Sequence, residues 1–484
     1  MRVLITSLPG HGHLGPLIPL ATATRDAGHE VAIATSGTFR ETLERHGLAL
    51  EPCGPMWRES DFGHSFDQPH LLVDLGKFLS LEVTSRILAD MGAAAARFRP
   101  DVIVSNDYEP NGRVVAERTG IPFVLASSGP RVPRSLRERL QARLLQAARL
   151  AGGLPATGEL DYTLRWLHIC FSPREHWVFG PGGEMPTEAP NQFAIRPRIA
   201  EYGAEYVPPI ERRRPSSPHP QSAETHPAGP GSAGCDSAGA KSGTAGCDSS
   251  GPQSGSAGCD SPGPKSGSAG CDSTDSKSGA AGGDSISPKS GAPGRPGPVT
   301  LCTFGTVFNK EPRLFRTVIS AIAPRVRRLL VLPGPGMPPE SLAPLPENVE
   351  LLGEVALSSV LPFVDYVVSH GGTATLSAAQ MLGKPCLLLP LGADQIINAA
   401  ACQRSGLSVV RFHTIGAVNV GASPLGPMTE ASVREAFDEL IAEPAYPARA
   451  AAFRRALEAL PPMESAIPLL EQLATTRTPV LRQP

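Results

Sequence analysis

The sequence predicts an α/β protein with two domains, each a parallel β-sheet covered by helices on both faces. Strand-like apolar segments alternate with helix-like segments in residues 1–210, and the same alternation returns from residue 299. Strands that alternate with helices favour parallel sheets, because each helix carries the chain back to the start of the next strand. Residues 211–298, between the two blocks, differ from both in composition.

The first block contains five short apolar segments that we expect to be strands. They are residues 2–6, 31–35, 48–52, 101–105 and 122–127. Helices are expected between them, with Gly28, Gly47 and Gly120 at their ends, because glycine suits the left-handed conformation that closes a helix. Residues 53–79 show no regular pattern.

The second block repeats this logic with six expected strands. They are residues 299–305, 328–333, 349–352, 366–372, 385–390 and 407–411. Two Rossmann-like domains in tandem form a cleft at the carboxyl ends of their strands. We therefore expect an N-terminal domain over 1–210, a C-terminal domain over 299–462, and a last helix with a tail over 463–484 that returns to the N-terminal domain.

The tract over 211–298 is expected to be a disordered linker. Five copies of a 12-residue repeat run from Ser232 to Gly291, with almost no aliphatic or aromatic side chains. Such a segment cannot bury enough apolar surface to offset the entropy of ordering it. Four of the nine cysteines recur in these repeats. The other five are expected to be small core residues, at positions 53, 170, 302, 386 and 402.

Composition indicates a soluble globular protein. The 484 residues are 41% hydrophobic and 19% charged, with a formal net charge of −2. No basic stripe suits nucleic acid, and no apolar run of 18 residues could span a membrane. The N-terminus does not resemble a signal peptide, so a cytoplasmic location is expected. The oligomeric state stays open.

The opening motif GHGHLG, residues 10–15, allows two interpretations. It fits the dinucleotide fingerprint G-x-G-x-x-G after a strand, which predicts an NAD(P)-dependent oxidoreductase. That site needs an acidic residue at the end of the second strand, where this chain has Thr35 and Ser36. Alternatively, His13 is a general base, oriented by Asp107 at the end of another parallel strand. The simpler alternative is that His13 only packs against the helix.

A second motif lies in residues 367–399. A buried strand ends at Ser369, and His370-Gly371-Gly372 leads directly into a helix, whose N-terminus favours an anion such as a diphosphate. His370 and Thr375 could add side-chain donors. Asp394 and Gln395 follow the next strand, where they could bind several hydroxyls. Together these features predict a site for a nucleotide sugar.

At these residues the chain resembles the inverting glycosyltransferases of the UDP-glycosyltransferase superfamily, which have the two-domain GT-B fold. The bacterial enzymes that glycosylate macrolides and enediynes are the most similar. The segment GHGHLGPLIPLATATRDAGHEV resembles their N-terminal motif, CTFGTVF the start of their C-terminal domain, and residues 349–410 their donor-binding signature.

The resemblance implies a role for each matching residue. His13 would deprotonate the acceptor hydroxyl, Asp107 would orient it, and His11 is the alternative base. The donor would be a TDP- or UDP-sugar. The residues implied in its binding are Gly305 and Thr306 near the diphosphate, His370, Gly371, Gly372 and Thr375 holding it, and Asp394 and Gln395 on the sugar.

The chain departs from the family at two positions. Residues 354–357 read Glu-Val-Ala-Leu where many relatives carry Trp-x-Pro-Gln beside the base, and Ala378 replaces a Glu that contacts the ribose. The choice between uridine and thymidine therefore stays open.

The expected reaction is a metal-independent, in-line displacement with inversion, because no Asp-x-Asp motif is present to bind a divalent ion. The expected acceptor is a small apolar molecule of polyketide type, in a pocket lined by Trp57, Phe62, Phe66 and Phe78. Besides the oxidoreductase, a catalytically silent partner protein with the same fold is an alternative.

Overall fold

The N-terminal sheet has seven parallel strands in the order β3-β2-β1-β4-β5-β6-β7. The strands are β1 (Arg2–Thr6), β2 (Glu30–Thr35), β3 (Ala49–Pro52), β4 (Val102–Asn106), β5 (Phe123–Ser127), β6 (Leu167–Cys170) and β7 (Gln192–Ala194). The central strands β4 and β5 are buried along their whole length, as expected for a sheet covered on both faces.

The structure is a computed structural model, and it describes residues 1–57, 80–130, 145–155, 165–173, 189–200, 297–306, 309, 311–335, 337–392, 394–412 and 428–482. All of these residues belong to one compact unit. The expected linker falls outside the described residues apart from Gly297 and Pro298.

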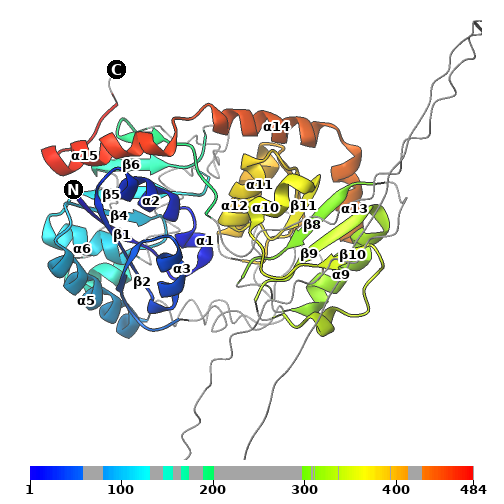
Figure 1. The fold of residues 1–484 in the computed structure, drawn as a ribbon, viewed down its shortest axis with the longest axis horizontal. Coiled ribbons are helices and arrows are strands. Elements are labelled where there is room, and N and C mark those ends of the chain that lie inside the picture. Colours follow the sequence, from blue (N-terminus) through cyan, green and yellow to red (C-terminus); the bar gives the residue numbers. More distant parts are fainter. Residues whose placement is uncertain are drawn as a thin grey trace, which may run out of the picture. The chain divides into compact units, whose positions relative to one another are not determined.

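Helices of the N-terminal domain connect these strands (Figure 1). They are α1 (His11–Leu14), α2 (Ile18–Asp26), the 3₁₀ turn η1 (Gly37–Phe39), α3 (Arg40–Arg45), α5 (Leu81–Phe98) and α6 (Asn111–Thr119). In α5 the buried side chains recur at helical spacing, and the Ser80 hydroxyl accepts a hydrogen bond from the Val83 amide at the N-cap. Gly28, Gly47 and Gly120 have positive φ, as their expected positions at helix ends require.

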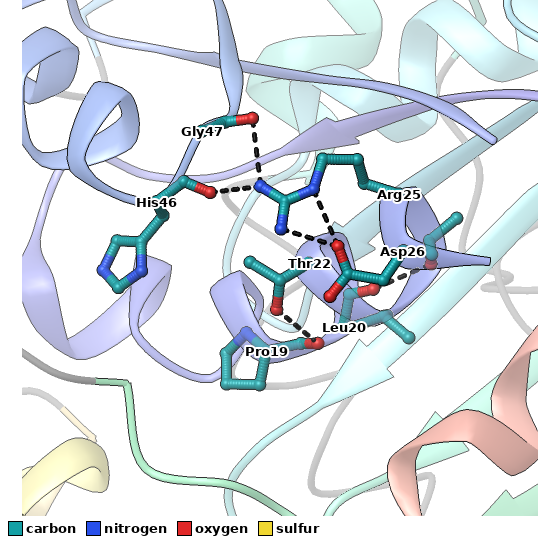
Figure 2. A network of polar contacts seen from close by, with 8 residues as sticks. Pro19, Leu20, Thr22, Arg25, Asp26, His46 and Gly47 are labelled. Carbon is teal, nitrogen blue, oxygen red and sulfur yellow. Dashed lines mark hydrogen bonds and ion pairs between the residues drawn. The ribbon is translucent and has the colours of Figure 1, made fainter. Parts of the chain in front are cut away.

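Arg25 joins the end of α2 to the end of α3 (Figure 2). Its guanidinium donates to the carbonyls of His46 and Gly47, the latter at 3.1 Å, and is paired with Asp26 at 2.7 Å. These carbonyls lie just past the last turn of α3, where an arginine can satisfy the free acceptors of a helix end. The bonds fix the chain between β2 and β3.

The C-terminal sheet has six parallel strands in the order β10-β9-β8-β11-β12-β13. They are β8 (Val299–Thr303), β9 (Arg328–Leu332), β10 (Val349–Leu351), β11 (Tyr366–Ser369), β12 (Cys386–Leu388) and β13 (Ser408–Val410). All six strands expected from the second block are present.

The helices of the second block include α9 (Pro312–Ile322), α10 (Leu357–Val360), α11 (Thr373–Met381) and α12 (Gln395–Arg404), followed by α13 (Glu430–Ala442) and α14 (Ala445–Glu458). Short 3₁₀ turns lie at η4 (Ala323–Arg325), η5 (Pro339–Leu342) and η6 (Leu361–Phe363). Thr429 and Ser432 form a reciprocal capping box that starts α13.

The chain ends with η7 (Met463–Ser465) and α15 (Ala466–Thr476), drawn red in Figure 1. Ile467, Leu470 and Leu473 of α15 are buried in the same apolar cluster as strands β1, β4 and β5. The last helix therefore completes the core of the N-terminal domain. Two further clusters form the core of the C-terminal domain.

The five cysteines outside the repeats are buried free thiols, which confirms their expected place in the core. Burial raises the pKa of the Cys53 and Cys402 thiols to about 12. These two side chains are therefore uncharged at neutral pH.

Candidate active site

The opening motif forms a short helix immediately after β1. Gly10 is the N-cap of α1, and its carbonyl accepts hydrogen bonds from the amides of His13 (3.0 Å) and Leu14 (2.9 Å). Because α1 is the first element after β1, both histidines lie at the carboxyl end of the sheet. This edge is where ligands bind in open α/β folds.

The two imidazole rings contact different residues. His11 packs edge-on against Phe39 at 5.1 Å between ring centroids, and His13 packs edge-on against Tyr108 at 5.7 Å. Asn106, the last residue of β4, donates from Nδ2 to the carbonyl of His13 at 3.3 Å. His13, rather than His11, is therefore attached to the loop that carries Asp107.

His13 is electrostatically coupled to two carboxylates. Burial lowers the pKa of the His13 imidazole below 6.5, while the charges of Asp394 and Asp107 oppose this shift. The ring is consequently neutral at pH 7, which is the form that can accept a proton. The structure thus brings together three of the residues that the sequence singled out.

Asp107 follows β4 directly and is bonded to the neighbouring strand. The hydroxyl of Ser127, at the end of β5, donates to Oδ1 of Asp107 at 2.7 Å. Ser127 was not identified from the sequence, because no motif surrounds it.

A second carboxylate, that of Glu109, stabilises the loop that carries Asp107. Glu109 is 1% exposed and accepts hydrogen bonds from the Thr6 hydroxyl (2.8 Å) and from the amides of Asn111 (2.8 Å) and Gly112 (2.6 Å). These amides belong to the first turn of α6, where a negative charge is favourable. Glu109 therefore connects the end of β1 to the start of α6.

In the C-terminal domain, the His370 ring packs against the backbone of Gly305 and Gly372. His370 follows β11, and its ring packs so closely that a Cβ on Gly305 or Gly372 would lie within 2.9 Å of Nε2. Gly305 and Gly371 have φ values of +71° and +81°, which glycine adopts without strain. Gly372 is the N-cap of α11.

Burial also determines the charge of His370. The side chain is 7% exposed, and burial lowers the pKa of its imidazole to about 4, against the opposing effects of Asp394 and of a hydrogen bond with the backbone of Thr303. At neutral pH the ring is an uncharged hydrogen-bonding group at the N-terminus of α11. Thr375 is buried in the first turn of this helix, and Thr306 is half-buried after β8.

Asp394 is held at the start of α12. Its Oδ2 accepts from the Thr373 hydroxyl at 2.6 Å and from Nδ2 of Asn398 at 3.1 Å. Gln395 is buried, and its Oε1 accepts from the amides of Leu391 (2.8 Å) and Gly392 (3.2 Å). The Gln395 oxygen therefore shapes the loop after β12.

A pocket lies next to Thr373 and Asn398, the two hydrogen-bond partners of Asp394. Thr373 and Asn398, the partners of Asp394, line it together with apolar side chains that include Phe171, Leu376 and Phe453. Sequence reasoning missed Thr373 and Asn398, although Asn398 stands one helical turn after Asp394 in α12.

The expected acceptor pocket is described only at Trp57. This residue is half-buried after β3, with its amide 3.2 Å from the Ser36 hydroxyl, and it is not among the lining residues of the pocket next to Thr373 and Asn398. Phe62, Phe66 and Phe78 lie outside the described residues.

Within the described ranges, no group of three or more His, Cys, Asp or Glu side chains is arranged to hold a metal ion. In the same part of the chain, no helix is both long and apolar enough to cross a membrane.

Comparison with known families identifies the C-terminal region. Residues 331–473 match the family model of the erythromycin biosynthesis protein CIII-like C-terminal domain. This range runs from the end of β9 into α15, so it includes His370 and Asp394.

Among curated proteins, the chain is similar to demethyllactenocin mycarosyltransferase of Streptomyces fradiae, with 38% identity over 19% of this chain and 20% of that protein. It is 33% identical to L-demethylnoviosyl transferase of Streptomyces niveus over 35% and 45% of the two chains. These matches span less than half of each relative. TDP-daunosamine transferase of Streptomyces peucetius is 23% identical over 98% of this chain and 97% of its own.

Solved structures match over nearly the whole chain. The calicheamicin glycosyltransferase has a TM-score of 0.64 at 18% identity, covering 99% of each chain. A glycosyltransferase of Streptomyces sp. SF2575 complexed with thymidine diphosphate has a TM-score of 0.59 at 20% identity, covering 98% of this chain and 99% of that one.

The two parallel sheets and these structural matches define the class of the protein: the chain has the GT-B fold of glycosyltransferases. Its residues 331–473 are similar to the erythromycin biosynthesis protein CIII-like C-terminal domain. The expected fold and family resemblance are confirmed.

Proposed function

We propose that the protein is an inverting glycosyltransferase that moves a sugar from a TDP- or UDP-sugar to a hydroxyl of a small apolar natural product of polyketide type. The observation that carries this proposal is that the hydrogen bond from Asn106 to the His13 carbonyl, at 3.3 Å, joins His13 to the loop of Asp107, while the charges of Asp394 and Asp107 both act on the imidazole. In this proposal the neutral imidazole of His13 is the base, and the carboxylate of Asp394 binds hydroxyls of the sugar.

In the proposed reaction, His13 accepts the proton of the acceptor hydroxyl while its oxygen attacks the anomeric carbon of the donor sugar. The bond from that carbon to the diphosphate breaks, and its electron pair leaves with the diphosphate. Because attack and departure occur on opposite faces, the configuration inverts. Asp107 orients the imidazole and stabilises its protonated form.

The negative charge that develops on the diphosphate needs stabilisation. The N-terminus of α11 supplies fixed backbone dipoles, and His370, Gly371, Gly372 and Thr375 surround that helix start. Gly305 and Thr306 contribute from the loop after β8. Fixed dipoles need no reorganisation during the reaction, so this arrangement can work without a metal ion.

Asp394 and Gln395 are proposed to bind the sugar, Asp394 through its carboxylate and Gln395 chiefly by shaping the loop. Trp57, with Phe62, Phe66 and Phe78, is proposed to contact the acceptor. The names of the relatives support this substrate class, since they include transferases of mycarose, noviose and daunosamine derivatives. A cytoplasmic location stays a prediction.

An oxidoreductase is less well supported. Ser36, which follows β2 where a dinucleotide site needs an acidic residue, is buried and donates its hydroxyl to the Pro55 carbonyl at 2.9 Å.

The proposal is tested by incubating the protein with an α-linked TDP-sugar and a panel of aromatic polyketide and macrolide aglycones in excess EDTA. A β-glycoside formed in equal amount with TDP is the expected product, detected by mass spectrometry and by the anomeric proton coupling. An α-glycoside, or activity that requires an added metal ion, would contradict the proposed mechanism.

A further inference from the structure

A chain of hydrogen bonds runs from Asp107 across the N-terminal sheet. The Ser127 hydroxyl donates to Oδ1 of Asp107 at 2.7 Å, and Nε2 of His168 lies 2.7 Å from the same hydroxyl oxygen. Asp107 follows β4, Ser127 ends β5, and His168 lies in β6. Three adjacent strands thus contribute one residue each.

Hydrogen-bond chemistry fixes the direction of this chain. A carboxylate can only accept, so the single hydroxyl proton of Ser127 points to Asp107. The hydroxyl oxygen then accepts from His168, which requires the proton of the imidazole to be on Nε2. Ser127 and His168 are 2% and 4% exposed, so these bonds are shielded from water.

His168, at the other end of this series of hydrogen bonds, also contacts Cys170. Gln192 of β7 donates from Nε2 to the Cys170 sulfur at 2.9 Å, and that sulfur lies 3.3 Å from Nε2 of His168. Nε2 of His168 therefore lies between the hydroxyl of Ser127 on β5 and the sulfur of Cys170 on its own strand β6.

We propose that Ser127 and His168 are positioning residues that hold the carboxylate of Asp107 toward His13. This inference rests on the His13–Asp107 pair of the proposed function. A surface carboxylate can rotate freely, whereas one oxygen fixed by a buried hydroxyl restricts the group to the orientation that serves the imidazole. Neither residue would contact the substrate.

The direct readout is the ionisation of His13 in the free protein, which needs neither donor nor acceptor. Asp107 and Asp394 are the charges that raise the pKa of His13 against burial. In the Asp107→Asn variant the pKa of His13 is therefore expected to fall. Ser127→Ala keeps the Asp107 carboxylate but removes the hydrogen bond that orients it. The pKa of His13 is therefore expected to lie between the wild-type and Asp107→Asn values.

The experiment is an NMR titration of ring-labelled histidine, with the His13 signal assigned by its loss in His13→Ala. Ser127→Thr keeps a hydroxyl and is expected to retain the wild-type pKa. His168→Leu removes the donor at the other end and is expected to shift the pKa in the same direction as Ser127→Ala. Ser105→Ala is the matched control, because Ser105 is an equally buried serine on β4 that contacts Thr6 instead.

The outcomes test the positioning role of Ser127 and His168 separately from the His13–Asp107 pair. If Asp107→Asn lowers the pKa of His13 while Ser127→Ala and His168→Leu leave it unchanged, the positioning role is wrong and the pair stands. If Asp107→Asn also leaves it unchanged, the pair itself is rejected.

Turnover gives an independent check in the enzyme with donor and acceptor. A loss of kcat of about 10- to 100-fold is expected for Ser127→Ala, with an unchanged donor KM, because misplacing a catalytic group by about 1 Å has an effect of that size. A rise in KM at constant kcat, or a loss equal to that of Ser105→Ala, would overturn the positioning role.

Discussion

His370 leaves no space for a side chain on Gly372, since a Cβ there would lie 2.4 Å from Nε2 of His370. The imidazole therefore packs directly on the backbone at the start of α11. This contact places a neutral hydrogen-bonding group beside the amides that would receive a diphosphate.

Gly372→Ala is expected to weaken the binding of TDP by at least about tenfold, which is about 1.4 kcal/mol. Because φ of Gly372 is −61°, alanine can adopt the backbone conformation, and the effect comes from displacement of the His370 ring. Calorimetric titration measures it. Gly92→Ala in α5 is the control, as a Cβ there meets no atom within 4 Å; equal affinities in the two variants would reject this account.

His13→Ala is expected to lower kcat by two to four orders of magnitude, the usual contribution of a general base. His11→Ala should have a much smaller effect, because its ring packs against Phe39 rather than beside Tyr108. Steady-state kinetics of both variants decide between the two histidines. A larger loss in His11→Ala would reverse the assignment.

The pH profile of kcat should show an acidic limb below pH 6.5. Burial lowers the pKa of His13, and the neutral ring is the active form, so turnover rises as pH increases through that pKa. In Asp107→Asn, which removes a charge that raises the pKa, the limb should move to lower pH. A limb above pH 6.5 in the wild type would show that another group controls the rate.

His370 should reduce the stability of the fold in acid. Its pKa is about 4 in the folded state and about 6.5 when unfolded, so the unfolded chain binds the proton first as pH falls. The free energy of unfolding should therefore decrease by about 3 kcal/mol between pH 6.5 and pH 4 from this residue alone. His370→Gln should lack this part of the decrease. Chemical denaturation of both proteins at several pH values measures the difference, and parallel curves would contradict the prediction.

Deletion of residues 231–291 should change the melting temperature and turnover little, because the repeats lack the apolar side chains that could join a core. Differential scanning calorimetry and steady-state kinetics compare the deletion variant with the full chain. A large loss of either property would reject the expectation of a disordered linker.

The fold was largely predictable because its central strands are continuous apolar runs between helices that end in glycine. The strands β6 and β7 were missed, since LHIC and QFA are short and carry polar residues among the apolar ones. Their place in the sheet depends on pairing with β5 rather than on their own pattern.

The candidate site was predictable where glycines and histidines form a motif, as in GHGHLG and HGGT. The supporting residues were not. Ser127 and His168 are 41 residues apart, and only the pairing of β5 with β6 brings them together. Thr373 was overlooked within its own motif because its bond to Asp394 joins the starts of two helices that follow different strands.

The most direct test of the central claim is a calorimetric titration of the protein with TDP, UDP and NADH in the absence of metal, repeated on His370→Ala. TDP or UDP should bind the wild type and, at 100 times the dissociation constant, increase the free energy of unfolding by about 2.7 kcal/mol. The variant should lose this binding. Binding of NADH alone would mean that GHGHLG is a dinucleotide loop and would contradict the assignment of a glycosyltransferase.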